Sequence, residues 1–153
     1  MGSDPETLVT EFHKKYGLAI NLTNSEILGL DDLTVRENLI REEYDEVMEA
    51  IMHLAEAMED PECDTNDVKG YHENVLKELC DLVYVVVGTA VSWDYDFETA
   101  FARVHASNMS KDGSVNDDGK MTKGPSYSIA HMEDCVWTQD GYDTSEYDDD
   151  ASD

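Results

Sequence analysis

Acidic residues at helical spacing are the side chains of this sequence that could do chemistry. Glu42, Glu43 and Glu46 lie close together in the chain, and Glu78 and Asp81 form a second group further along. Because residues three or four apart share one face of an α-helix, each group can present two carboxylates to a neighbouring helix. Carboxylate oxygens without Cys or His favour magnesium, with manganese as the alternative, over zinc. One or two such ions could be surrounded by the carboxylates of Glu43, Glu46, Glu78 and Asp81.

The two acidic groups differ in how strongly they indicate a metal. Residues 41–46, taken alone, are more typical of the solvated face of an amphipathic helix. Glu78 and Asp81 instead interrupt an apolar segment, where an unpaired buried carboxylate costs on the order of several kcal/mol. The chain has 10 Lys and Arg against 36 Asp and Glu, so we expect a divalent cation to pair with these acids rather than basic side chains. A partly hydrated helix end is the alternative for Glu78 and Asp81.

Magnesium held by carboxylates would suit chemistry on phosphates. The ion keeps open positions for water and phosphate oxygens, neutralises phosphate charge and activates water as a nucleophile. The net charge of −26 disfavours binding of nucleic acid and of anionic membranes. A polyphosphate could be held only through bound cations or a few well-placed basic groups. The pattern therefore predicts hydrolysis of a phosphoanhydride, with no nucleic-acid or membrane partner.

Two long amphipathic helices are predicted to position the acids. Apolar residues recur at three- and four-residue steps from Thr34 to Glu59, and Thr34-x-x-Glu37 has the pattern of a capping box. A second helix is predicted over residues 71–93, because this apolar segment is too long for a strand. The remaining predicted segments are two shorter helices, residues 4–16 and 97–109, and two loops, residues 18–32 and 60–70.

The predicted fold class is all-α. We expect a bundle of four to five helices in one domain over residues 4–130, followed by a disordered or irregular acidic tail over residues 131–153. This tail holds nine acidic residues and no Lys or Arg. Several helices are apolar on more than one face, which predicts that a homodimer completes the bundle.

Cysteine usage and hydropathy indicate the compartment. The three cysteines have no regular spacing, which argues against a disulfide framework. The N-terminus lacks the pattern of a signal peptide, and the longest apolar run is too short to cross a membrane. We therefore expect a soluble cytoplasmic protein.

Three motifs in order resemble those of a known superfamily. The EExxE pattern of residues 42–46 with the ExxD pattern of residues 78–81 is similar to the signature of the all-α NTP pyrophosphatases. This superfamily includes MazG, the dimeric dUTPases and phosphoribosyl-ATP pyrophosphohydrolase. Residues 101–111 and the KGPxY motif of residues 123–127 resemble later segments of MazG-like proteins. Together the motifs cover roughly residues 5–130, and the MazG-like fold is expected for this region. The resemblance also implies a helical dimer or a dimer of dimers.

The resemblance implies a reaction and roles for named residues. A magnesium-dependent enzyme would cleave the α–β phosphoanhydride of a (d)NTP or related nucleotide, giving a nucleoside monophosphate and pyrophosphate. Glu42 would orient or deprotonate the attacking water, while the other four acids bind magnesium. Asn108 would contact the sugar or base and Lys111 a phosphate. Lys123 and Tyr127 lie in a segment that could close over phosphates.

Purely structural roles stay open for these residues, and non-enzymatic functions stay open for the chain. Lys111 could be an ordinary lysine at a helix C-terminus, and residues 123–127 could simply form a turn. The alternative functions are a catalytically weak nucleotide-binding regulatory module, or a helical module that binds cations or proteins. The sequence specifies neither the base nor the sugar of a nucleotide substrate.

Overall fold

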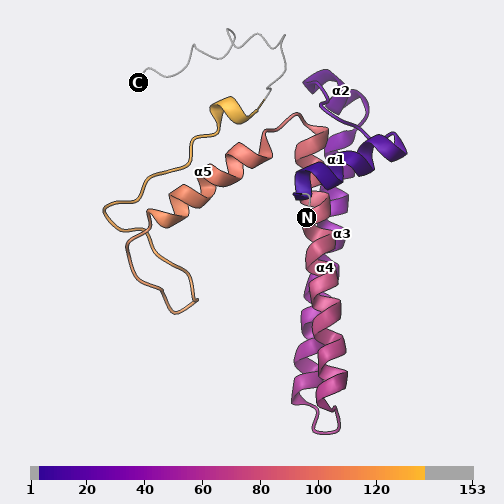
Figure 1. Ribbon diagram of the computed structural model, residues 1–153, viewed down its shortest axis with the longest axis vertical. Coiled ribbons are helices and arrows are strands. Elements are labelled where there is room, and N and C mark those ends of the chain that lie inside the picture. Colours follow the sequence, from indigo (N-terminus) through magenta and orange to yellow (C-terminus); the bar gives the residue numbers. More distant parts are fainter. Residues whose placement is uncertain (1–3, 137–153) are drawn as a thin grey trace. The chain divides into compact units, whose positions relative to one another are not determined.

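The computed structural model describes residues 4–136, which form five α-helices and one short 3-10 helix (Figure 1). The described residues form two compact units, the first ending at Trp93 and the second beginning at Asp94. The described residues contain no strand, only isolated bridges between Tyr95 and Val136 and between Val115 and Met121. The predicted all-α fold class is therefore confirmed, whereas dimerisation stays a prediction. None of the helices in the described region is both long enough and apolar enough to span a membrane.

The first unit is built on a long helical hairpin. Its two arms are α3, Asp32–Glu59, and α4, Thr65–Ser92, which pack against each other (Figure 1). The shorter α1, Pro5–Tyr16, packs on α4, and α2, Asn24–Gly29, contacts α3. Small residues line the hairpin interior, among them Ala50 and Ala90, which are nearly fully buried.

Local capping explains where α1 and α4 begin. The Asp4 side chain accepts a hydrogen bond from Thr7 N at 3.0 Å, and Pro5 occupies the first turn, where no backbone donor is needed. Asp64 and Asp67 form a reciprocal capping box at the start of α4. This box starts α4 within the predicted loop of residues 60–70, several residues before the predicted start at Tyr71.

Two further boundaries differ from prediction. Thr34 does not cap α3, which begins at Asp32; its hydroxyl instead donates to Asp31 Oδ1 at 3.0 Å from inside the first turn. Glu37 forms an ion pair with Arg41 at 2.7 Å rather than a capping box. The predicted loop of residues 18–32 contains α2, which a Thr23–Glu26 capping box starts.

A buried polar layer joins α1, α3 and α4 at one end of the hairpin. The His13 Nδ1 donates to the carbonyl oxygen of Ala19 at 2.8 Å. Arg36 is buried beside Asp32, which also accepts a hydrogen bond from Trp93 Nε1 at 2.8 Å. The Trp93–Asp32 hydrogen bond joins the end of α4 to the start of α3, so it helps to set how these two helices face each other.

The second unit contains α5, Phe97–Met109, a loop, and the 3-10 helix Glu133–Cys135. Asp96 caps α5 through Thr99 N at 3.1 Å. Arg103 of α5 forms a bidentate ion pair with Asp134, which lowers the pKa of Asp134 to about 2.

The predicted domain and tail map onto these units as follows. The predicted domain over residues 4–130 spans both units. Residues 131–136 of the predicted tail contain the 3-10 helix with the buried Cys135, and residues 137–153 lie outside the described residues.

Candidate metal centre

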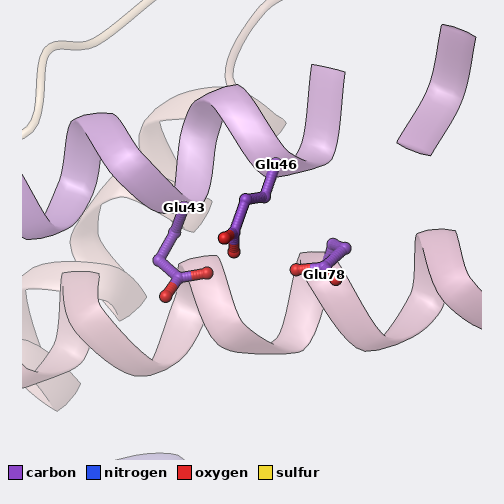
Figure 2. Close-up of side chains that lie close together, drawn as sticks. All are labelled: Glu43, Glu46 and Glu78. Atoms are coloured by element: carbon purple, nitrogen blue, oxygen red, sulfur yellow. The ribbon is translucent and has the colours of Figure 1, made fainter. Parts of the chain in front are cut away.

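Three carboxylates from the helical hairpin converge on one point. Glu43 and Glu46 are one turn apart on α3 and reach toward α4, where Glu78 faces them (Figure 2). Each of the three offers a carboxylate oxygen, and these oxygens all lie within 4.8 Å of one another. This spacing lets a single cation contact all three side chains. The EExxE pattern and the packing of α3 on α4 together produce the arrangement.

Burial leaves part of this cluster without partners. Glu78 is only 9% exposed, and Glu43 is partly buried, whereas Glu46 is exposed. The Oε2 atoms of Glu43 and Glu78 are buried and accept no hydrogen bond. A buried carboxylate oxygen without a donor or cation is energetically costly. An all-carboxylate donor set with two unsatisfied oxygens fits magnesium or manganese.

Burial and neighbouring negative charge raise the pKa of Glu43. Burial is the main cause that raises the pKa of Glu43 to about 7, followed by the hydrogen bond and negative charge of Glu46. The charges of Asp81 and Glu42 add smaller contributions in the same direction. A divalent cation would reverse this effect, because it favours the ionised carboxylate.

Asp81 and Glu42 lie at the border of the cluster. Asp81 is partly buried, Glu42 is exposed on α3, and both act electrostatically on Glu43. Among the described residues, the three-carboxylate group comprises Glu43, Glu46 and Glu78 and does not include Asp81. Asp81 instead forms an ion pair, described next.

Lys77 pairs with two of the predicted metal ligands. Its Nζ lies 3.2 Å from Glu78 Oε1 and 2.8 Å from Asp81 Oδ2, and hydrogen bonds to these carboxylates raise the pKa of Lys77. The expectation that basic side chains would not pair with Glu78 and Asp81 is therefore wrong. The sequence carries the signal, since Lys77 precedes Asp81 by four residues on one helix.

Basic and aromatic residues gather in the second unit. Lys123 Nζ lies 4.5 Å from the ring centroid of Tyr127. The pKa of Tyr127 is lowered, chiefly by a hydrogen bond with the Ser107 side chain and also by the charges of Lys123 and Lys111. The structure thus brings together three of the predicted substrate residues. Ser107, which belongs to the 101–111 motif but has no predicted role, links Tyr127 to α5.

Close packing shapes the loop that carries these lysines. A Cβ at Gly124 would overlap Asp112 Oδ1, which accepts a hydrogen bond from Ser126 N at 3.3 Å. Glycine is therefore required at this position of the KGPxY motif for a steric reason. Asn108 is exposed near the end of α5, and its carbonyl oxygen accepts a hydrogen bond from Lys111 N at 3.2 Å.

The sequence matches a known protein family. The sequence model of the family PRA-PH, phosphoribosyl-ATP pyrophosphohydrolase, matches residues 9–108, roughly two thirds of the chain. The match includes all five acidic residues discussed above and Asn108, whereas Lys111, Lys123 and Tyr127 lie beyond it. No curated protein matches the chain.

Proposed function

Because the chain belongs to the phosphoribosyl-ATP pyrophosphohydrolase family, a MazG-like group of all-α NTP pyrophosphatases, we propose that it is a magnesium-dependent nucleotide pyrophosphohydrolase. It would cleave the α–β phosphoanhydride of a nucleoside triphosphate or a related nucleotide, releasing pyrophosphate. Family membership supports a pyrophosphohydrolase that acts on a nucleotide. The proposed metal site is supported chiefly by the convergence of Glu43, Glu46 and Glu78, where two buried carboxylate oxygens have no hydrogen-bond partner.

The acidic residues divide into metal ligands and a base in this proposal. Glu43, Glu46, Glu78 and Asp81 hold magnesium, with manganese as an alternative. When bound, the metal neutralises phosphate charge and acidifies a bound water. Glu42, exposed beside the cluster, orients the attacking water and accepts its proton.

Asn108, Lys111, Lys123 and Tyr127 are the proposed substrate-binding residues. Lys111 and Lys123 are cations in a chain of net charge −26, and both act electrostatically on Tyr127. Such a group suits the oxygens of a polyphosphate. Asn108 would contact the sugar or base of the nucleotide.

A product assay tests the proposed reaction. The full chain is incubated with magnesium and each ribo- and deoxyribonucleoside triphosphate, and with phosphoribosyl-ATP, which the family description names. Pyrophosphate release that stops when the metal is chelated is the expected result. Release of orthophosphate would contradict α–β cleavage, and no release from any nucleotide would overturn the enzyme hypothesis.

Glu46→Gln tests the assignment of the cluster. The substitution keeps the side-chain volume but removes a charged ligand, so we expect pyrophosphate release to fall by about 100-fold or more. Helix content by circular dichroism is expected to stay unchanged, because Glu46 is exposed. Glu49→Gln is the matched control on the same helix, since Glu49 contacts His53 rather than the cluster. Full activity of Glu46→Gln would remove the site assignment.

A further inference from the structure

The ion pairs of Lys77 place an ammonium group where a metal would compete for the same carboxylates. Lys77 Nζ contacts Glu78 Oε1 at 3.2 Å and Asp81 Oδ2 at 2.8 Å. Its side chain is 64% exposed, whereas the Glu78 side chain is 12% exposed. The lysine therefore reaches the cluster from its solvent side and can return to water without disturbing the helical packing.

Lys77 neutralises only part of the negative charge of the carboxylate cluster. Its ammonium satisfies the outer oxygens of Glu78 and Asp81, yet Glu78 Oε2 and Glu43 Oε2 remain buried without a partner. A single positive charge faces several carboxylates, and among the described residues Lys77 pairs with Glu78 and Asp81 but not with Glu43 or Glu46. The deeper oxygens are therefore left for a cation that can enter between α3 and α4.

We propose that Lys77 is a tethered competitor of the metal, which neutralises Glu78 and Asp81 in the metal-free protein and must leave them when a divalent cation binds. This inference rests on the proposed metal site. An ammonium and a divalent cation on the same carboxylates repel each other at short range. The two cations share the carboxylate of Glu78 even when they take different oxygens, so their repulsion makes the loss of the Lys77 ion pairs part of metal binding.

The competition predicts a gain in metal affinity when the lysine is removed. Mn²⁺ binding to the full chain without nucleotide is measured from the electron paramagnetic resonance signal of the free ion. Lys77→Met is expected to lower the Mn²⁺ Kd by about threefold or more, in line with the free energy of such ion pairs. Lys77→Arg keeps the charge and should stay near wild type.

A matched control separates local competition from the general charge of the chain. Lys69→Met removes the same charge from an exposed position of the same helix, so it should change the Mn²⁺ Kd much less than Lys77→Met. An equal Kd for the two variants would overturn the inference. A weaker affinity in Lys77→Met would also overturn it, because Lys77 would then support the metal site.

Chemical labelling follows the displacement itself. Acetylation of individual lysines in the wild-type chain is measured by mass spectrometry with and without Mg²⁺. We expect Mg²⁺ to increase the labelling of Lys77 but not of Lys69, and an unchanged rate at Lys77 would contradict displacement. The two proposals can fail separately. Displacement of Lys77 by Mg²⁺ without pyrophosphate release would contradict only the enzymatic function. Metal-dependent pyrophosphate release without displacement of Lys77 would contradict only this inference.

Discussion

Glu78 is the acidic residue whose surroundings most clearly indicate a cation ligand. It is buried on α4, it has one oxygen paired with Lys77 and one without a partner, and it faces two carboxylates of α3. A carboxylate in such a place destabilises the metal-free fold unless a cation is available. Its presence is therefore better explained by ligand binding than by stability.

Glu78→Gln should separate these two roles. The amide keeps the shape and removes the buried charge, so the free energy of unfolding of the metal-free protein should fall by no more than about 1 kcal/mol, or rise. Stabilisation by Mg²⁺, measured as the shift in Tm, should disappear together with pyrophosphate release. A variant that still gains the wild-type Tm shift from Mg²⁺ would show that Glu78 is not a ligand.

The raised pKa of Glu43 predicts a pH dependence of stability. With a pKa of about 7 in the folded protein against 4.5 ordinarily, Glu43 holds a proton in the folded state that the unfolded chain has released. Its contribution to the free energy of unfolding is therefore present below about pH 4.5 and is lost as pH rises through about 7. Glu43→Gln should gain stability relative to wild type across this interval, by on the order of 1–3 kcal/mol.

Denaturant unfolding of the metal-free protein at several pH values tests this dependence. Glu11→Gln, which removes an exposed carboxylate of α1, should follow the wild-type curve. Parallel curves for wild type and Glu43→Gln would argue against the raised pKa.

At the residue scale, spacing is enough to select the acids but not their partners. The EExxE and ExxD patterns by themselves place carboxylates on shared helix faces. Whether those faces meet depends on how α3 packs against α4, which the patterns do not encode. The scarcity of basic residues in the whole chain does not predict the pairing of Lys77, because an ion pair depends on the immediate neighbours of each acid.

At the scale of elements, the buried polar layer sets how the hairpin arms face each other. Arg36 lies two turns before Glu43 on α3, and Gly88 lies two turns after Asp81 on α4. The absence of a side chain at Gly88 leaves room for Arg36 and His13 between the helices.

Gly88→Ala is expected to destabilise the protein. The new Cβ would lie 3.0 Å from Arg36 Nη1 and 3.1 Å from His13 Nε2, which requires buried polar groups to move at a cost of about 1–3 kcal/mol. Gly70→Ala is the matched control on α4, since nothing lies within 4 Å of its Cβ. That variant should gain about 0.5–1 kcal/mol from helix propensity. Thermal or denaturant unfolding measures both, and a stabilised Gly88→Ala would contradict the packing argument.

Periodicity predicts that the helices exist, whereas it does not predict several of their boundaries. The predicted helix over residues 97–109 matches α5, since Asp96 offers an unambiguous cap. The start of α4 differs from prediction because the polar stretch after Asp64 has the composition of a loop although it contains a capping box. Asp31 begins α3 from a left-handed conformation, with φ of 52°, and no local pattern indicates that geometry.

At the scale of the whole molecule, apolar surface on the first unit is the property that remains to be explained. An apolar groove lies between α1 and α4, lined by residues that include Leu8, Leu79 and Val83. These three side chains are 43–50% exposed, and Leu76 on α4 is 63% exposed. Apolar periodicity predicts that these helices have more than one apolar face. A soluble monomer rarely exposes a contiguous apolar patch of this kind, and burial against a second copy is the remedy that we propose.

Val83→Lys tests whether a second copy covers this face. A charge in a dimer interface should raise the Kd of dimerisation by about tenfold or more, while a monomer would tolerate it at an exposed position. Sedimentation velocity of the wild type should show a dimer or a dimer of dimers, with a shift toward monomer for Val83→Lys. Leu28→Lys is the control, because Leu28 on α2 is 70% exposed and lies outside the groove. A monomeric wild type would rule out self-association, and a Val83→Lys variant that sediments like an oligomeric wild type would rule out α4 as the interface.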